Sequence, residues 1–182
     1  MTAPLSPADV LTKLDASRGR LVDAFGTLSD AQWSWAPDDK IWTAAHIAEH
    51  LAVIAFGTSK LLTEKFASLE PASYTPEQQA KKDAMIPIAV ANRGTKLESP
   101  ANVRPKGRWG TRAEIMAKLL YGHDAIADAV RSSTVDLRSR TAPHPFLGSF
   151  DGLQWAVFTV AHADRHIAQL DEMRALPEFP RA

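Results

Sequence analysis

Apolar residues recur three or four positions apart in four long segments of the chain, which is the spacing of a buried helical face. The first segment follows Ser6 and Pro7, a capping serine and a proline at the first helical position, and it ends at about Leu28. The second segment has Thr43 as its expected N-cap and ends near Phe66. Both segments predict amphipathic helices with one face in a core.

The second half of the chain shows the same pattern twice more. Thr111 is a candidate N-cap, and Glu114 three residues later completes a capping box for a helix that ends at about Ser132. The last helix is expected to begin near Asp151 and to end at about Ala175, shortly before two prolines. Four long helices without a convincing strand predict an all-α four-helix bundle.

The connection between the second and third long helices holds an extra element. Residues 76–92 begin as a polar helical turn that can continue past Pro87, although that proline should break or kink the helix. Residues 93–110 are rich in glycine, proline and charge, and we expect a long loop. Such a loop can serve as a lid or binding segment, while a mobile surface insertion is the simpler interpretation. The connection is long enough to cross the bundle, so the pattern leaves the up-down order of the helices open.

The composition fits one folded domain over residues 1–182 and argues against several classes of partner. Lys and Arg together number 21, as do Asp and Glu, so the formal net charge is zero and a nucleic-acid partner is not expected. No apolar run reaches the roughly 18 residues of a membrane helix, so no membrane partner is expected. The N-terminal sequence MTAPLSPADV lacks the basic and apolar regions of a signal peptide. These features predict a cytoplasmic protein.

The candidate chemistry lies in the histidines, because the chain has no cysteine and therefore no thiolate ligand or cysteine nucleophile. His46 and His50 are four residues apart in the second predicted helix, and His162 and His166 are four apart in the last. Residues at this spacing project from one helical face. Three neutral imidazoles with open positions suit a catalytic Zn²⁺, Ni²⁺ or Fe²⁺ site. The alternative is ordinary helices whose histidines face solvent or form hydrogen bonds in the core.

Two motifs resemble those of a known family. Trp42-Thr43, followed by His50-Leu51 eight residues after the tryptophan, resembles the "WS…HL" helix of DinB-like proteins. The later segment resembles the "HP…G…QW…H..RH..Q" signature of the YfiT-like, DinB_2 branch, through His144-Pro145, Gly148, Gln154-Trp155, His162, Arg165-His166 and Gln169. The two motifs lie toward the two ends of the chain, and the second is specific.

The resemblance implies a DinB/YfiT-like four-helix bundle with a divalent metal near one end. Its metal ligands, carried over by motif, are His50, His162 and His166. His46 stands where relatives often have an acidic or polar residue, so we treat it as a flanking residue, with a role as fourth ligand as the alternative. No catalytic residue is assigned.

Several other residues near these motifs have more than one interpretation. Gln169 either orients a ligand or metal-bound water or is a buried or capping amide. His123 lies on the apolar stripe of the third helix and either reaches the same pocket or is a core histidine, which we favour. Glu49 is a hydrogen-bond acceptor, a general base or, as we expect, a solvent-exposed residue. Arg165 either binds an anionic substrate or, as we expect, forms a structural ion pair. Trp42 is expected to pack in the core, with a role as a platform for a ligand as the alternative.

The resemblance also implies a function. The family includes transferases and isomerases that use a low-molecular-weight thiol, namely glutathione, mycothiol or bacillithiol, with a small-molecule substrate. Because the chain lacks cysteine, a thiol would have to come from such a cofactor. The alternatives are a metal-dependent hydrolase, in which the metal activates water, and a non-catalytic, stress-related metal-binding dimer. Relatives are often homodimers, and the apolar content allows one.

Overall fold

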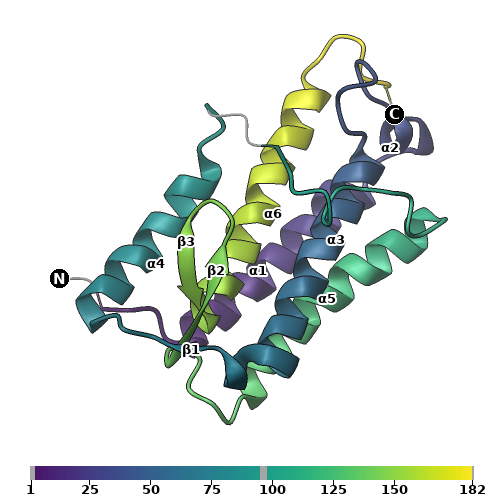
Figure 1. Cartoon of the computed structure of the whole chain (residues 1–182). Helices are drawn as coiled ribbons and strands as arrows, with labels where there is room; N and C mark the ends of the chain where they lie inside the picture. Colours follow the sequence, from purple (N-terminus) through teal and green to yellow (C-terminus); the bar gives the residue numbers. More distant parts are fainter. Residues whose placement is uncertain (1–2, 95–97, 182) are drawn as a thin grey trace.

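Four long helices pack side by side in the computed structural model, which describes residues 3–94 and 98–181 (Figure 1). The helices are α1 (Pro7–Gly26), α3 (Ala44–Lys60), α5 (Arg112–Ser132) and α6 (Gly152–Arg174). They correspond to the four predicted segments, and the predicted four-helix bundle is confirmed. Residues 95–97 of the predicted loop lie outside the described residues, and the rest of the loop is described.

Each long helix begins with a capping box. The capping residues are Ser6, Thr43, Thr111 and Asp151, whose side chains accept the backbone N–H three residues later. In each case the side chain of that third residue returns a bond to the backbone N–H of the capping residue. The box satisfies N–H groups that have no partner inside the helix, so these starting points are determined locally.

Within the described residues, two shorter helices and two irregular turns accompany the bundle. α2 (Asp30–Ser34) lies in the first connector, and α3 continues into a π-helical turn, Leu61–Lys65, and a 3-10 turn, Phe66–Ser68. α4 (Pro76–Ala91) is one helix that continues past Pro87, so of the outcomes left open by the sequence the helix does not break at the proline.

Tertiary packing explains why α4 continues past its proline. Ile86 and Val90, on either side of Pro87, are both buried in the core, and α4 lies against α6. The packing of these side chains offsets the backbone hydrogen bond that a proline cannot donate.

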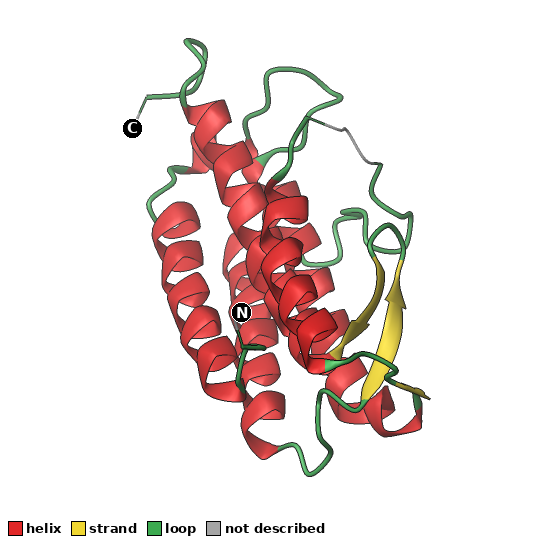
Figure 2. Ribbon diagram, turned by 90° about the vertical axis from the view of Figure 1, so that its left-hand side faces the viewer, coloured by secondary structure: helices red, strands yellow, loops and turns green. Residues whose placement is uncertain are grey.

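A small antiparallel sheet lies beside the helices (Figure 2). Its strands are β1 (Glu70–Pro71), β2 (Arg140–His144) and β3 (Gly148–Asp151), and β2 and β3 form a hairpin. The expectation of no strand is therefore wrong. These strands have between two and five residues, too few for a clear alternation in the sequence. The hairpin is held by burial of Ala142 and Phe150, which pair across it.

The long connection carries the chain across the bundle, so that α3 and α5 run in the same direction (Figure 1). The two helices approach closely at Gly122, where a β-carbon would lie 2.7 Å from Cβ of Ala55 and 3.2 Å from the backbone nitrogen of Phe56. Glycine at this position therefore permits the contact between α3 and α5.

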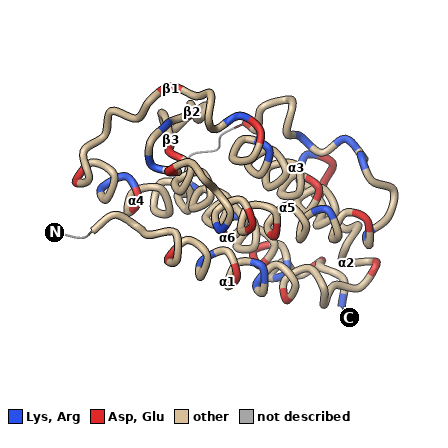
Figure 3. The backbone as a smooth tube through the Cα atoms, turned by 90° about the horizontal axis from the view of Figure 1, so that it is seen from below, with Lys and Arg blue, Asp and Glu red and all other residues tan. Residues whose placement is uncertain are grey.

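Acidic and basic residues are interspersed along the helices (Figure 3). Arg18 pairs with Asp124 on α5, and Arg20 pairs with Asp164 on α6, each at 2.8 Å. Exposed pairs of this kind contribute about 1 kcal/mol or less each. Among the described residues, no helix combines the length and apolarity needed to cross a membrane.

Replacing Gly122 with alanine should destabilise the fold by about 1–3 kcal/mol, because the new methyl group would overlap backbone and side-chain atoms of α3. Gly57 on α3 is a matched control, since a β-carbon there meets nothing within 4 Å. Gly57→Ala should stabilise the protein by roughly 0.5–1 kcal/mol through the higher helix propensity of alanine. Denaturant unfolding measures both, and equal effects of the two substitutions would contradict the close contact.

Candidate metal centre

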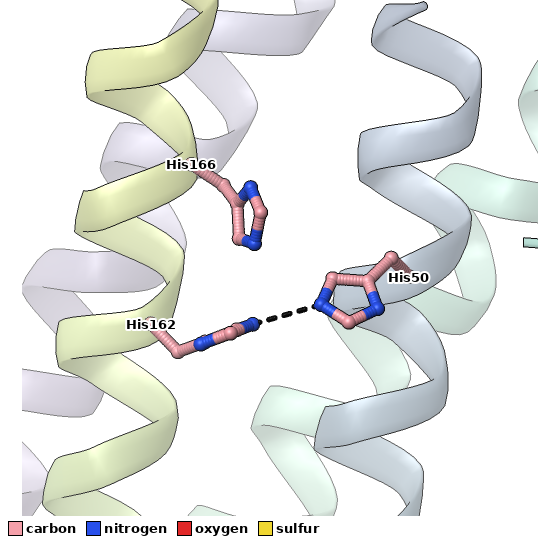
Figure 4. A group of neighbouring side chains, drawn as sticks. All are labelled: His50, His162 and His166. Carbon is pink, nitrogen blue, oxygen red and sulfur yellow. Dashed lines mark hydrogen bonds between the residues drawn. The ribbon is translucent and has the colours of Figure 1, made fainter. Parts of the chain in front are cut away.

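Three histidines meet between α3 and α6 in the interior of the bundle. His50 comes from α3, and His162 and His166 come from successive turns of α6, with the three rings directed toward one another (Figure 4). One ring nitrogen of each histidine lies within 4.8 Å of those of the other two. His50 and His166 are buried and His162 is half-buried. The structure thus brings together the three residues expected as metal ligands.

In two of these rings a hydrogen bond holds Nδ1, which leaves Nε2 available to coordinate a metal ion. Nδ1–H of His50 donates to the Val103 carbonyl at 2.7 Å, and Nδ1–H of His166 donates to Oε1 of Gln169 at 2.8 Å. A neutral imidazole carries one proton, so Nε2 of both rings has a free lone pair. Nε2 of His50 lies 2.9 Å from Nε2 of His162. Metal-binding histidines typically have such an outer partner on the second nitrogen, so this donor set fits a divalent ion.

The environment keeps these imidazoles neutral. Burial lowers the pKa of His50, and burial, followed by the proximity of His166 and His50, lowers the pKa of His162 well below its ordinary value. Burial, with His50 as the next cause, lowers the pKa of His166 to about 3. Neutral imidazole is the form that binds a metal. The cluster is therefore in its ligand form at neutral pH.

Aromatic rings surround the cluster. The Trp42 ring lies 5.0 Å from the ring of His50 and 6.4 Å from that of His166, against which it is stacked. On the other side, Phe158 lies 5.2 Å from His162. Trp42 packs against the hydrophobic core as predicted, and its ring also lies next to two imidazoles of the cluster. An apolar surrounding of this kind restricts solvent at a metal site.

Glu49 is buried, contrary to the prediction that it faces solvent. Its side chain is only 2% exposed because loop residues cover this face of α3. Burial alone would raise its pKa, but hydrogen bonds from Lys106, Arg108 and Gly107 hold the pKa below its usual value. Glu49 is therefore a fixed anion at neutral pH and is poorly suited to act as a general base. The periodicity of α3 carries no information about a loop that covers it.

The other residues considered from the sequence lie outside the cluster. His46 is exposed, and its Nδ1 accepts the N–H of Thr43 in the helix cap at 3.4 Å. His123 is buried on α5, with Nδ1 3.2 Å from the Leu119 carbonyl oxygen. Arg165 donates to two backbone carbonyls of the α4 end, at 2.9 and 2.5 Å, instead of the expected ion pair.

Sequence reasoning missed two features of the site. The Val103 carbonyl is a backbone group, so no residue type signals its role. The second is His144, which belongs to the later motif but for which the sequence suggested no role. Its ring on β2 lies 4.5 Å from that of Phe158, which in turn contacts His162.

Metal affinity should depend weakly on pH between 7 and 5. An imidazole with the usual pKa of about 6.5 would be mostly protonated at pH 5, and three such ligands would weaken binding by roughly ten-thousandfold. Because the pKa values of all three histidines are lowered in the folded protein, protons compete less, and the loss should be far smaller. Competition titrations with a metal indicator at several pH values would measure this. A ten-thousandfold loss in protein that stays folded would contradict it.

The same shifts have a consequence for stability. Histidines in the unfolded chain bind protons below pH about 6.5, whereas the folded, metal-free protein resists protonation at these sites. The unfolded state then binds more protons, so the stability of the metal-free protein should fall as the pH drops below that value. Denaturant unfolding across this pH range would measure the slope.

Comparisons with known proteins agree with the fold. The sequence profile described as "DinB superfamily" matches residues 13–170. The chain is similar to the uncharacterized protein YuaE of Bacillus subtilis (strain 168), with 23% identity over 148 residues that cover 81% of this chain and 86% of YuaE. It also resembles the crystal structure of TT2238, a four-helix bundle protein, with a TM-score of 0.59 and 19% identity, covering 92% of this chain and 99% of the other.

Proposed function

The chain belongs to the DinB superfamily, and from that premise we propose that it is a metal-dependent enzyme, a thiol-dependent S-transferase or isomerase acting on a small molecule. The observation that carries the proposal is the set of three converging neutral imidazoles, His50, His162 and His166. In the described parts of the chain, three side chains make up this group. A structural zinc site usually has four protein ligands, so three favour an open position for a cofactor or substrate.

The residues around the cluster support this chemistry. Val103 and Gln169 hold two of the rings with Nε2 free, and the aromatic rings of Trp42 and Phe158 restrict water. A divalent ion bound there would stabilise a thiolate at neutral pH. His162 is half-buried, which leaves the cluster within reach of a small molecule. The thiol itself has to be a cofactor such as glutathione, mycothiol or bacillithiol, since the chain has no cysteine.

Thiol transfer is favoured over hydrolysis by the state of Glu49. Hydrolysis at a metal site normally uses a nearby group that accepts a proton from water. Glu49 is the carboxylate next to His50 in sequence, and it already accepts four hydrogen bonds from the loop. It is therefore poorly placed to serve as that proton acceptor.

Metal content and thiol binding test the proposal together. Elemental mass spectrometry of untagged protein should find one divalent ion per chain. Protein loaded with Co²⁺ or Ni²⁺ should then develop a thiolate-to-metal absorption band with one particular low-molecular-weight thiol. Stoichiometric metal without a band for any of the thiols would contradict the transferase proposal, and no metal after reloading would contradict the metal site.

A further inference from the structure

The loop between α4 and α5 is tied to α3 at two neighbouring residues. The carboxylate of Glu49 binds the backbone at residues 106–108, and the ring of the adjacent His50 binds the Val103 carbonyl. We propose that Glu49 is a positioning residue, which holds the loop so that the Val103 carbonyl keeps His50 in its metal-binding tautomer. The proposal rests on the proposed metal site and adds a residue that does not touch the metal.

The carboxylate of Glu49 is enclosed by consecutive backbone N–H groups. Oε1 accepts the N–H of Lys106 at 2.8 Å and that of Arg108 at 3.2 Å, while Oε2 accepts the N–H of Gly107 at 3.0 Å. Gly107 has a φ of +67°, a conformation that glycine adopts without strain. Successive N–H groups turned toward one point form an anion-binding nest. Glu49 therefore provides the anion around which this part of the loop folds.

Arg108 connects this nest to the segment that carries Val103. Its Nη1 donates to Oε1 of Glu49 at 2.8 Å and to the Arg104 carbonyl at 2.7 Å. Its Nη2 donates to the Asn102 carbonyl at 3.1 Å. The guanidinium thus binds the residues on both sides of Val103 while Glu49 holds it in place. The position of the Val103 carbonyl is consequently linked to the carboxylate.

The Val103 carbonyl determines which nitrogen of His50 carries the proton. The carbonyl can only accept, so the bond at 2.7 Å requires the proton on Nδ1 and leaves Nε2 free to bind a metal. If the loop moves away, the proton can occupy Nε2, and the ring has to change tautomer before it coordinates. Loss of an outer partner of a metal-binding histidine typically weakens metal affinity by about 10–100-fold.

Glu49→Gln tests the proposal, since glutamine keeps the length of the side chain but replaces one acceptor oxygen by an NH₂ that faces N–H donors. Two quantities should change. Metal affinity, measured by titration with Zn²⁺ alone, should fall by about 10–100-fold with the stoichiometry retained. In metal-free protein, ¹⁵N NMR of the histidine rings should show His50 shifting from the Nδ1–H toward the Nε2–H tautomer, while His166, held by Gln169, stays unchanged.

Glu98→Gln is the matched control, because Glu98 belongs to the same loop and pairs with Arg104 at 3.1 Å, but is 89% exposed. It should leave both the tautomer and the affinity as in the wild type. Arg108→Met is a second variant, which keeps the three backbone bonds to Glu49 but removes the link to the segment around Val103. It should shift the same two quantities by a smaller amount.

A folded Glu49→Gln protein with the wild-type His50 tautomer and affinity would overturn the proposal. If Glu49→Gln does not fold, the test is Arg108→Met, and a folded Arg108→Met protein with the wild-type His50 tautomer and metal affinity would overturn the proposal. The tautomer is measured in metal-free protein without any thiol, so this result is separate from the proposed function. A wild-type protein that binds Zn²⁺ but no thiol would contradict the transferase proposal and leave this one standing.

Discussion

His162→Ala should abolish stoichiometric metal binding, with a loss of metal affinity of more than about a hundredfold. Removing only a group that hydrogen-bonds to a metal-binding histidine already lowers the affinity by about 10–100-fold, so removing a ligand should cost more. His162 is one corner of a triangle of rings: its ring centroid is 5.1 Å from that of His50 and 4.7 Å from that of His166, and those two centroids are 5.1 Å apart. Without it, two imidazoles from different helices remain. Calorimetric titration with Zn²⁺ and elemental analysis after dialysis would measure the loss.

His46→Gln is the matched control for this substitution. His46 is also a histidine at four-residue spacing from a member of the cluster, but it is exposed and caps α3. Glutamine can replace it in the capping box, so metal binding should remain as in the wild type. Circular dichroism should show that both variants are folded. Wild-type affinity in His162→Ala would remove His162 from the ligand set, and loss of binding in His46→Gln would place His46 in it.

Arg138→Ala should destabilise the fold by about 3–5 kcal/mol, the cost of leaving buried charges unpaired. Arg138 donates to Asp83 at 2.9 and 2.7 Å and to Asp151 at 2.7 Å, and the carboxylates are 5% and 0% exposed. The carboxylate of Asp83 also accepts hydrogen bonds from the backbone N–H of Leu5 at 2.8 Å and from the Nε2 amide group of Gln154 at 3.0 Å. The network joins the N-terminal segment, α4, the residues before β2 and the start of α6, so its loss should affect the whole fold.

Arg131→Ala is the control for the buried network. Arg131 pairs with Asp128 at 2.8 Å, but the side chains are 57% and 75% exposed. Its removal should change the free energy of unfolding by roughly 0.5 kcal/mol or less. Denaturant unfolding of both variants measures the difference. A loss below about 1 kcal/mol for Arg138→Ala would show that the two buried carboxylates are neutralised in some other way.

The starts of the helices were predictable because they depend on contacts between residues three apart. Ser6, Thr43 and Thr111 each form a capping box within their own turn, and the helix after Asp151 starts in the same way. The apolar spacing then identified the buried faces, since it reports which side of each helix lacks solvent. These signals were sufficient for the four long helices and for the class of the fold.

The histidine cluster was predictable in part. The spacing of His162 and His166 places both rings on one face of α6, and the resemblance to the DinB-like motif added His50 from a distant helix. That α3 and α6 bring the three rings together depends on the assembled bundle. The spacing of His46 and His50 equally allowed a fourth ligand, and the structure instead leaves His46 exposed at the helix start.

The starts of the long helices and the faces that they bury follow from local sequence, because these properties arise from neighbours within one or two turns. The assembled fold, in contrast, determines that α4 continues through Pro87 and that Glu49 is enclosed by a loop more than fifty residues away. It also decided that a backbone carbonyl, at Val103, holds His50. Each of these depends on contacts between segments distant in the chain, and a local pattern of residue types carries no information about which distant segment will cover it.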